Sequence, residues 1–404
     1  MQRRPLLEGL LLGGVATLVG RRARAADTHG VTATEIKIGN TNALSGPASA
    51  YGVIARTEAA YFRMINDQGG IAGRRINFIY YDDAYSPPRA VEEVRKLVEE
   101  DEVAFLFNTL GTPSNTAIRP YLNQKKVPQL FVFSGADKWG DYQHFPWTVG
   151  YLPSYRTEAA IYGKYILSEK PDARIGVLYQ NDDYGKDYFT GLKQRLGDKF
   201  DKLIAKVVTY ETSDPTVDSQ VVALQTAGAD VFVNITTPKF AAMAIRKAGE
   251  IGWKPLHLLN NVSASVGSVL KPAGLDKSVG LITAAYVKDP TDKRWDDDPG
   301  MKAWRSFMDK YMPTADQTDG FTTAGYAAAF VMTHVLRQCG DDFSRENILK
   351  QATNIKGLEV PVFFPGIRVD TSPTNHQPIR QLQLTRFTGT YWEPFGGIIE
   401  GADV

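Results

Sequence analysis

The sequence predicts an α/β protein of two lobes, each built around a parallel central sheet. Length is the first observation, because 404 residues are more than one hydrophobic core usually serves. The second is that strand-like and helix-like stretches alternate from Glu35 onwards, which indicates βαβ units. Composition is the third: 43% hydrophobic and 23% charged residues are ordinary for a globular protein.

The first series of alternating elements occupies residues 35–133. An alternating strand at 35–39 is followed by a helix at 50–68, which Gly69 and Gly70 end. A strand at 76–81 precedes a helix that begins with Ser86 as N-cap and Pro87 at its first position and continues to about residue 100. Further strands are expected at 103–107 and 129–133, with a polar loop and a helix between them.

A second series of similar size follows, with helices at 158–167, 185–196, 217–227 and 240–252 and strands at 175–179, 204–208, 231–235 and 256–259. Beyond it we expect a strand at 281–286, helices at 301–311 and 322–337, and an alternating strand at 380–387. We therefore assign residues 34–150 and 283–362 to the first lobe and residues 151–282 and 363–404 to the second. The chain would cross between the lobes near 149–151, 281–283 and 362–364.

The N-terminal residues resemble an export signal. Arg3 and Arg4 precede a mostly apolar run at 6–19 that Glu8 interrupts, and the A-x-A sequence at 23–25 is typical of a cleavage site. We expect residues 1–25 to be a cleaved signal peptide, and Arg3-Arg4 resembles the start of a twin-arginine signal. We expect the mature protein to be periplasmic without direct membrane insertion. The alternative is a disordered basic tail.

Charge and motifs exclude several function classes. The net charge is +1, from 46 basic and 45 acidic residues, so no nucleic-acid partner is expected. The single cysteine, Cys339, cannot form an internal disulfide and is expected to be a buried thiol. None of the five histidines has metal-ligand spacing, and no phosphate loop, nucleophile elbow or dinucleotide motif occurs, so we predict no metal, cofactor or catalytic residue.

Polar residues that directly follow predicted strands have two interpretations. The acidic pairs at 82–83 and 182–183 fit turn and cap roles better than acid–base chemistry, because adjacent residues do not face each other. The loops at 109–115 and 134–136 carry small and hydroxyl residues at strand carboxyl ends, where open α/β sheets bind ligands. Each loop is either a ligand contact or an ordinary connection.

Several blocks in order resemble one family. They are Leu44-Ser45-Gly46-Pro47 with Tyr51-Gly52, the stretch 66–74, Asp82-Asp83 before Ala90-Val91, and Ile175-Gly176-Val177-Leu178 before Asp183-Tyr184-Gly185. Together they are similar to the branched-chain amino-acid type of periplasmic binding protein, the solute receptor of ABC importers. The resemblance implies a type I periplasmic binding fold, with two Rossmann-like lobes, a hinge of three strands and a ligand cleft. It also implies a membrane permease as partner.

The resemblance also implies which residues contact the ligand. They are Tyr51, Gly111, Thr112, Ser114, Gly135, Ala136, Tyr184, Thr237 and Phe321, together with the position of Asn261. Gly135 and Ala136 would offer backbone groups, and the loop of Gly111, Thr112 and Ser114 would meet a carboxylate.

Three departures from the family pattern concern the ligand. The disulfide that the family has early in the chain is absent here, because Tyr85 and Leu110 occupy the regions of its two cysteines. Asn261 is neutral where a carboxylate would pair with an amino-acid ammonium, so either Asp137 substitutes or the ligand has no ammonium. Tyr151, Tyr155 and Arg156 form an aromatic and basic cluster, in which Arg156 pairs either with an acidic ligand or with a hinge or surface carboxylate.

We therefore expect a non-enzymatic receptor that closes over a branched-chain or related amino acid and delivers it to the permease of an ABC importer. One alternative ligand is a carboxylate or amide without an ammonium, such as an aromatic acid. A second alternative function is a periplasmic sensor subunit of a signalling system.

Overall fold

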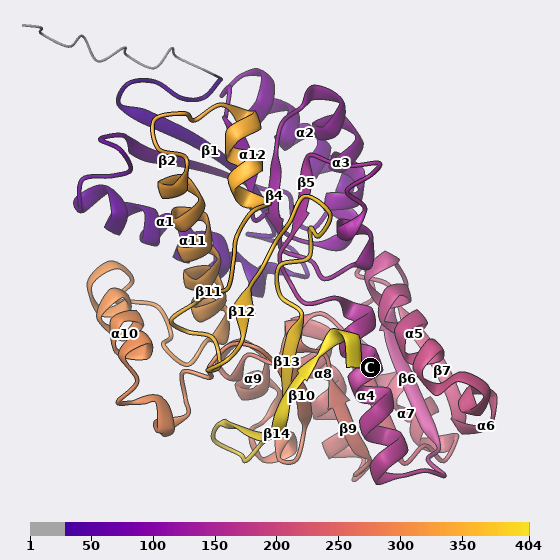
Figure 1. The fold of residues 1–404 in the computed structure, drawn as a ribbon. Coiled ribbons are helices and arrows are strands. Elements are labelled where there is room, and N and C mark those ends of the chain that lie inside the picture. The colour runs from indigo at the N-terminus through magenta and orange to yellow at the C-terminus, as the bar shows by residue number, and fades with distance from the viewer. Residues whose placement is uncertain (1–28, 404) are drawn as a thin grey trace, which may run out of the picture.

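The computed structural model describes residues 29–403, so the predicted signal peptide lies outside the described residues. Within that range the chain forms two lobes, each with its own sheet (Figure 1). The first sheet has the strand order β2-β1-β3-β4-β5, and all its pairings are parallel, as predicted. Its strands are β1 (Glu35–Asn42), β2 (Arg75–Asp82), β3 (Phe105–Phe107), β4 (Gln129–Val132) and β5 (Thr148–Gly150).

Helices α1 (Gly52–Asp67), α2 (Pro87–Glu99) and α3 (Thr112–Lys125) cover this sheet on both faces. Leu106 faces α2 and α3, where it packs with Val94 and Leu122. Its neighbour Phe107 points the other way, as successive strand residues do, and its ring lies 5.8 Å from that of Phe62 on α1. Both faces of the sheet are therefore apolar, which explains the continuous hydrophobic strands in the sequence.

The late helices α10 (Pro299–Tyr311), α11 (Gly320–Gln338) and α12 (Arg345–Ala352) return to the first lobe, as expected for a late completing segment. Tyr326 of α11 meets Tyr61 of α1 with ring centroids 4.9 Å apart. Arg345 of α12 donates from Nε to the carbonyl of Ala104 at 2.7 Å. Cys339, which follows α11, is buried as predicted, and burial raises the pKa of its thiol to about 12.

The second sheet has the order β14-β13-β10-β9-β8-β6-β7. Its strands are β6 (Ile175–Gln180), β7 (Ile204–Tyr210), β8 (Val231–Ile235), β9 (Leu256–Leu259), β10 (Ile282–Ala285), β13 (Gln381–Phe387) and β14 (Trp392–Glu400). The predicted parallel central sheet is confirmed in β10, β9, β8, β6 and β7, and β13 and β14 extend its edge in antiparallel pairs that the sequence did not predict. Only four residues separate β13 from β14, and so short a connection joins antiparallel strands.

Helices α4 (Tyr155–Glu169), α5 (Asp183–Leu196), α6 (Phe200–Leu203), α7 (Asp218–Thr226), α8 (Pro238–Glu250) and α9 (Lys271–Ala273) complete the second lobe. Leu224 of α7 and Phe240 of α8 pack with Leu178 and Phe232 of the sheet. His257 is also buried here, within 3.1 Å of the Asn234 amide, and burial lowers its pKa to about 3. His257 is therefore a neutral residue packed in the core of the second lobe.

The segments that cross between the lobes hydrogen bond with one another. Lys288 donates its N–H to the carbonyl of Val362 at 2.9 Å, and Phe364 donates to Tyr286 at 3.0 Å. The first crossing pairs with a third segment, because Gly150 donates to the carbonyl of His376 at 2.9 Å. The strands β11 (Leu358–Glu359) and β12 (Arg368–Val369) lie on either side of residues 362–364 in the sequence and pair as a small antiparallel ribbon (Figure 1).

Two of the predicted lobe boundaries need correction. The boundary at residue 283 falls inside β10, which belongs to the second sheet through Ala285. Residues 368–376, predicted for the second lobe, run along the first lobe, where Thr371 donates from Oγ1 to Ala352 at 2.8 Å. The chain joins the second sheet only at β13. These boundaries depend on which segments pair with each other, and the partners are far apart in the sequence. Local sequence patterns do not show which distant segments will pair.

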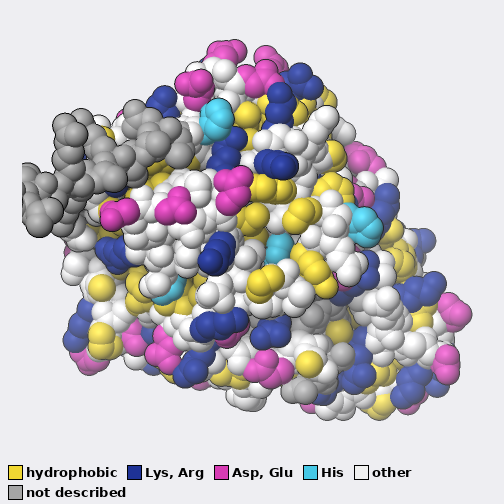
Figure 2. Space-filling model, turned by 45° about the horizontal axis from the view of Figure 1, so that its top comes forward, with side chains coloured by type: hydrophobic (Ala, Val, Ile, Leu, Met, Phe, Trp, Pro, Cys, Tyr) yellow, Lys and Arg dark blue, Asp and Glu magenta, His cyan; other side chains and the backbone are white. Residues whose placement is uncertain are grey.

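Within residues 29–403 no helix combines the length and apolar character needed to cross a bilayer. On the face shown in Figure 2, acidic and basic side chains are interspersed, as their nearly equal numbers suggest.

Candidate functional site: a closed pocket between the lobes

A small pocket of about 20 Å³ lies between the lobes, at the carboxyl ends of the strands. Both lobes contribute to its wall, through the segments that begin α1, α3, α4, α5 and α8. Five of the predicted ligand contacts line it: Tyr51, Gly111, Thr112, Tyr184 and Thr237. Tyr155, from the aromatic and basic cluster of the sequence, lines it as well. Parallel strands deliver their following loops to one edge of a sheet, and the two lobes turn these edges toward each other.

The start of α3 forms one wall of the pocket. Gly111 is its N-cap residue, with φ of 93°, and a Cβ at this position would lie 2.6 Å from the ring of Tyr85. Only glycine therefore allows the Tyr85 ring to pack here. Neither α3 nor α8 has a side-chain cap. At α8 the Thr237 N–H already donates to the Tyr210 hydroxyl at 2.9 Å, so the backbone groups that remain for a ligand are the N–H groups in the first turns of the two helices.

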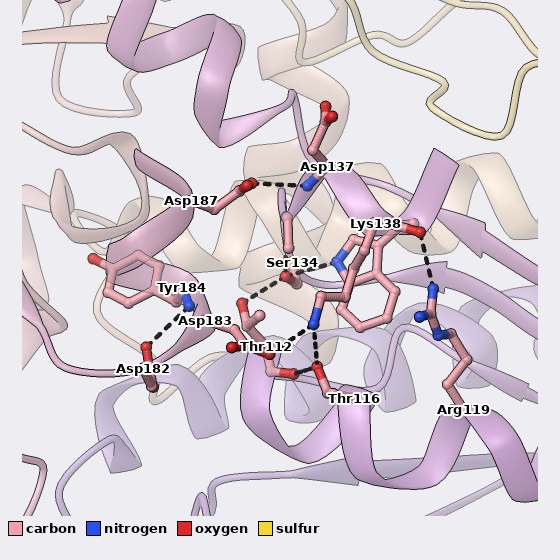
Figure 3. Close-up of polar contacts among 12 residues, drawn as sticks. Thr112, Thr116, Arg119, Ser134, Asp137, Lys138, Asp182, Asp183, Tyr184 and Asp187 are labelled. Atoms are coloured by element: carbon pink, nitrogen blue, oxygen red, sulfur yellow. Dashed lines mark hydrogen bonds and ion pairs between the residues drawn. The ribbon is translucent and has the colours of Figure 1, made fainter. Parts of the chain in front are cut away.

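Behind this wall the hydroxyls of Thr112 and Ser134 lie 2.7 Å apart, and Trp139 donates from Nε1 to Ser134 at 2.8 Å (Figure 3). Tyr155, from the second lobe, hydrogen bonds with the same two hydroxyls. Burial raises the pKa of its phenol to about 12, although the hydrogen bonds with Ser134 and Thr112 lower it. The pocket therefore contains a connected set of neutral hydroxyls.

Tyrosine rings form the opposite wall. Tyr155 stacks on Tyr188 with centroids 4.4 Å apart and meets Tyr184 edge-on at 5.4 Å. The Tyr184 hydroxyl accepts a hydrogen bond from Asn260 Nδ2 at 2.7 Å. Such a wall offers flat apolar area with a few fixed polar atoms.

The lobes are closed on each other around this pocket. Tyr51 in the first lobe donates its hydroxyl to the carbonyl of Val262 in the second at 2.9 Å. On one flank Asp137 donates its backbone N–H to Asp187 at 2.8 Å, and Lys138 pairs with Asp183 at 2.6 Å (Figure 3).

The other flank of the closed interface is held from α11. Asp319, which begins that helix, accepts hydrogen bonds from Ser265 at 2.7 Å and Ser268 at 2.5 Å of the second lobe. Direct contacts therefore close the site on both sides.

Comparison with known proteins identifies the family. A model of the periplasmic binding protein family matches residues 35–390. The chain belongs to this family. A Leu/Ile/Val-binding protein homolog from Brucella suis is 25% identical over 391 residues, covering 91% of each chain. The leucine-specific-binding protein of Salmonella typhimurium is 26% identical over 296 residues, covering 71% of this chain and 75% of that protein.

Solved structures share the fold of this periplasmic binding protein. A branched chain amino acid ABC transporter protein from Thermus thermophilus with bound valine superposes with a TM-score of 0.81 at 17% identity, covering 91% of this chain and 97% of that one. An ABC transporter solute binding protein from R. palustris in complex with 4-hydroxybenzoate has a TM-score of 0.76 at 16% identity, with coverage of 91% and 98%. At these identities the likeness concerns the fold alone.

None of the ten residues that line the pocket of this binding protein carries a formal charge. Asp182, two residues before Tyr184, caps α5 by accepting from the N–H groups of Tyr184 and Gly185, as the turn and cap interpretation predicted. The other predicted cap behaves likewise: Asp83 accepts from Tyr85 at 2.8 Å, and burial raises its pKa to about 6.

Asp137 and Arg156, the possible charged contacts, lie outside the pocket lining. The Asp137 carboxylate accepts from Ser154 at 3.0 Å and points away from Thr112 and Ser134 in Figure 3. Arg156 pairs from Nε with Asp187 at 2.7 Å and lies 3.7 Å from Asp137. The interpretation of Arg156 as a salt-bridge residue at the lobe interface therefore fits the structure, and its pairing with an acidic ligand does not.

Three further predicted contacts are also outside the lining. Ser114 is buried in the first turn of α3, beside Asp83. Gly135 uses its carbonyl to accept from Tyr155 at 2.7 Å, and Ala136 donates its N–H to Ser134 at 3.3 Å. A Cβ on Gly135 would lie 2.2 Å from the Pro153 carbonyl. The Gly135 carbonyl thus holds the segment that follows the first crossing, and the Ala136 N–H bonds within its own loop.

Asn261 and Phe321, the last two predicted contacts, line a second cavity of about 80 Å³ beside the hinge. The Asn261 amide donates to the carbonyl of Ala284 at 2.9 Å, and its backbone N–H donates to Glu158 at 2.7 Å. Its side chain is therefore fixed within the second lobe. Phe133 and Val262 line both cavities and so separate them.

The sequence did not identify several residues of the site as ligand contacts. Tyr85, Leu110, Phe133 and Val262 line the small pocket, and each follows or ends a strand, which was the available signal. Glu158 was missed for another reason: it lies inside α4 in a helical pattern. It accepts from Tyr162 at 2.6 Å and Tyr188 at 2.7 Å, and burial raises its pKa to about 7.

Across the described part of the chain, no group of three or more His, Cys, Asp and Glu side chains is placed to hold a metal ion.

Proposed function

We propose that this periplasmic binding protein is the extracytoplasmic substrate-binding subunit of an ABC importer, and that it acts without catalysing a reaction. It captures a small organic solute between its lobes and presents the closed form to a membrane permease. One observation carries the proposal: the pocket is walled by both lobes and closed by direct contacts such as Tyr51 to Val262. A solute that touches both walls favours the closed state, because only that state offers all the contacts.

The surroundings of the pocket support binding rather than chemistry. Its polar groups are hydroxyls and backbone N–H groups at helix starts, which suit recognition of a carboxylate or another acceptor. The predicted signal at residues 1–25 supports export to the periplasm, where such receptors work.

A branched-chain or related amino acid is the first candidate solute. The curated relatives named above are Leu/Ile/Val- and leucine-binding proteins, and they align over most of this chain. The carboxylate of such a ligand would lie at the starts of α3 and α8, and its apolar side chain against the tyrosine rings.

A carboxylate or amide without an ammonium is the second candidate. The observation that favours it is the uncharged lining, because a buried ammonium needs a carboxylate partner. Asp182 already caps α5, and the amide of Asn261 is held by Ala284.

Thermal-shift measurements with L-leucine, L-valine, benzoate and 4-hydroxybenzoate separate the two candidates, since a ligand of the folded state raises the unfolding temperature. Thr112→Val removes a pocket hydroxyl and should weaken the response, whereas the matched Thr226→Val on exposed α7 should not. Mass spectrometry of the solute that co-purifies gives an independent identification. A protein that carries no solute and responds to none of these compounds would contradict the proposal.

A further inference from the structure

Two helix starts from opposite lobes face each other on the flank of the closed interface that α11 forms. In the first lobe α11 begins after Asp319, which accepts the N–H of Phe321 at 3.0 Å. The facing start belongs to a short helical turn of the second lobe, Val266–Leu270, whose N-cap Ser265 accepts the N–H of Ser268 at 3.2 Å. Each cap therefore satisfies a backbone donor of its own helix.

The two caps are also bonded to each other across the interface. The Ser265 hydroxyl donates to one carboxylate oxygen of Asp319 at 2.7 Å, and the Ser268 hydroxyl donates to the other at 2.5 Å. In return the Gly320 N–H donates to the Ser265 hydroxyl oxygen at 3.2 Å. One carboxylate thus lies at the starts of two helices, where negative charge is favourable, and this arrangement exists only while the lobes are closed.

This set of bonds is shielded from water, unlike the contacts on the opposite flank. Asp319 and Ser265 are 7% and 5% exposed, whereas the side chains of the Lys138–Asp183 ion pair are 30% and 48% exposed (Figure 3). Water and salt screen an exposed ion pair, so it contributes little to stability, while a hydrogen bond to a buried charged group contributes more. The flank of Asp319 should therefore hold the lobes together more firmly than the other.

Gly267 allows the two helix starts to approach this closely. Its N–H donates to the carbonyl of Thr318 at 2.9 Å. A Cβ at this position would lie 2.9 Å from the Asp319 nitrogen, 2.9 Å from Thr318 Oγ1 and 3.0 Å from Asp316 Oδ2. Outside the glycine's own helical turn these are the three nearest atoms, and all belong to the first lobe. A side chain here would therefore obstruct closure and leave the second lobe by itself undisturbed.

These contacts do not involve the space that a solute fills. Gly267, Ser268 and Asp319 line neither the pocket nor the cavity beside the hinge. The bonds between the helix starts are therefore the same whichever solute is bound. A solute enclosed by both lobes leaves only when the lobes open, and opening breaks these bonds.

We propose that Asp319 and the two serines that it binds, together with Gly267, form a latch between the lobes, which sets how long the closed protein retains its solute. The inference rests on the proposed function and adds the regulation of that site. The pocket selects the solute, and the latch determines the lifetime of the complex. In the solute-free protein the same latch favours the closed form.

Spin labels on Glu92→Cys of α2 and Gln194→Cys of α5 test the latch in the solute-free protein, because both positions are exposed and the single native cysteine is buried. Pulsed electron resonance then measures the populations of closed and open molecules from the distance between the labels. Ser268→Ala removes one bond to the buried carboxylate and should lower the ratio of closed to open molecules about tenfold. Gly267→Ala should lower it at least as much, because the added methyl group collides with the first lobe.

Two matched controls lie within the second lobe. Ser278→Ala removes a hydroxyl that donates to the carbonyl of Gly274 at 2.9 Å, within the same lobe. Gly397→Ala adds a Cβ that meets nothing within 4 Å. Both control variants should keep the wild-type ratio of closed to open molecules.

The lifetime of the complex is measured with radiolabelled L-leucine and 4-hydroxybenzoate, by dilution of the loaded protein into an excess of unlabelled compound. For each probe that binds, the dissociation rate constant should rise about tenfold in Ser268→Ala and Gly267→Ala, because opening no longer breaks the full set of bonds. The two control variants should release the probe at the wild-type rate. Either latch variant suffices if the other fails to fold.

Wild-type dissociation rates in the folded latch variants would overturn the inference while leaving the proposed function intact. Faster release of one probe but not of a second bound probe would overturn it as well, because the latch does not contact the solute. If neither probe binds, the candidate solutes named above are wrong, and the label distances in the solute-free protein decide the inference. Unchanged distances in both latch variants would then overturn it.

Discussion

Gly111 leaves the space that the ring of Tyr85 occupies. The backbone that carries this ring is also unusual, because Ala84 and Tyr85 both have positive φ, of 49° and 61°. Asp82 and Asp83 stabilise this turn by accepting the N–H groups of Ala84 and Tyr85. Burial raises the pKa of the Tyr85 hydroxyl, and Asp182 of the second lobe raises it further. A backbone conformation that is rare for non-glycine residues is thus held in place next to the binding pocket.

Gly111→Ala should therefore weaken solute binding at least tenfold. The added methyl group collides with the Tyr85 ring, and the positive φ is strained for alanine, so we also expect a loss of about 1–3 kcal/mol in the free energy of unfolding. Gly197→Ala is the control, since its φ of 54° brings similar strain but its Cβ meets nothing within 4 Å. Denaturant unfolding and calorimetric binding measure both effects. Normal binding by Gly111→Ala would show that Tyr85 does not shape the site.

Glu158 should make stability depend on pH. Burial raises its pKa from 4.5 to about 7, so between these values the folded protein holds a proton that the unfolded chain has released. The contribution of this group to the free energy of unfolding is therefore greatest below pH 4.5 and falls as pH rises to 7, by up to about 3 kcal/mol.

Urea unfolding of the wild type, Glu158→Gln and the exposed control Glu92→Gln at pH 5 and pH 8 measures this dependence. The wild type should lose more stability than Glu158→Gln over that interval, and Glu92→Gln should follow the wild type. Equal losses in all three proteins would contradict the assignment.

At the scale of elements, the site is made from helix starts. Five helices begin at or next to a pocket residue: α1 after Tyr51, α3 at Thr112, α4 at Tyr155, α5 beside Tyr184 and α8 after Thr237. Their caps differ, since α5 is capped by the Asp182 side chain, whereas α3 and α8 have no side-chain cap. The uncapped starts are available to a ligand, and the capped start holds Tyr184 in position.

Asp182→Ala should cost about 1 kcal/mol in the free energy of unfolding and also weaken solute binding, because the first turn of α5 loses its acceptor and Tyr184 becomes mobile. Ser344→Ala removes a comparable cap from α12, far along the chain from the pocket residues, and should lose stability without losing affinity. Measuring both quantities for both variants separates a positioning role from a general loss of stability.

At the scale of the whole molecule, function depends on the balance between open and closed arrangements of the lobes. The closed arrangement is held by contacts on both flanks and by Tyr51 over the pocket. Each contact is modest alone, but a difference of one or two kcal/mol changes the ratio of closed to open molecules by a factor of 5 to 30.

Tyr51→Phe should shift the solute-free protein toward the open form by about fivefold, because one hydrogen bond between the lobes is lost. Small-angle X-ray scattering should then report a larger radius of gyration. Tyr311→Phe is the matched control: its hydroxyl donates to Asp67 within the first lobe, so the radius should stay at the wild-type value. Identical scattering from the three proteins would show that this bond does not control closure.

The sequence by itself determined the two α/β lobes and the order of their strands and helices, which follow from local periodicity, caps and turn residues. Its resemblance to the family implied the five predicted contacts that meet in the pocket, and the rule that ligands lie at strand carboxyl ends supports the two of them in the loop before α3. Tertiary structure alone decided the antiparallel β13 and β14, the return of residues 368–376 to the first lobe, and the engagement of Asn261 and Arg156 by their own neighbours. The physical reason is that a polar side chain is free for a ligand only if no protein group already satisfies it, and its partners lie far away in the sequence.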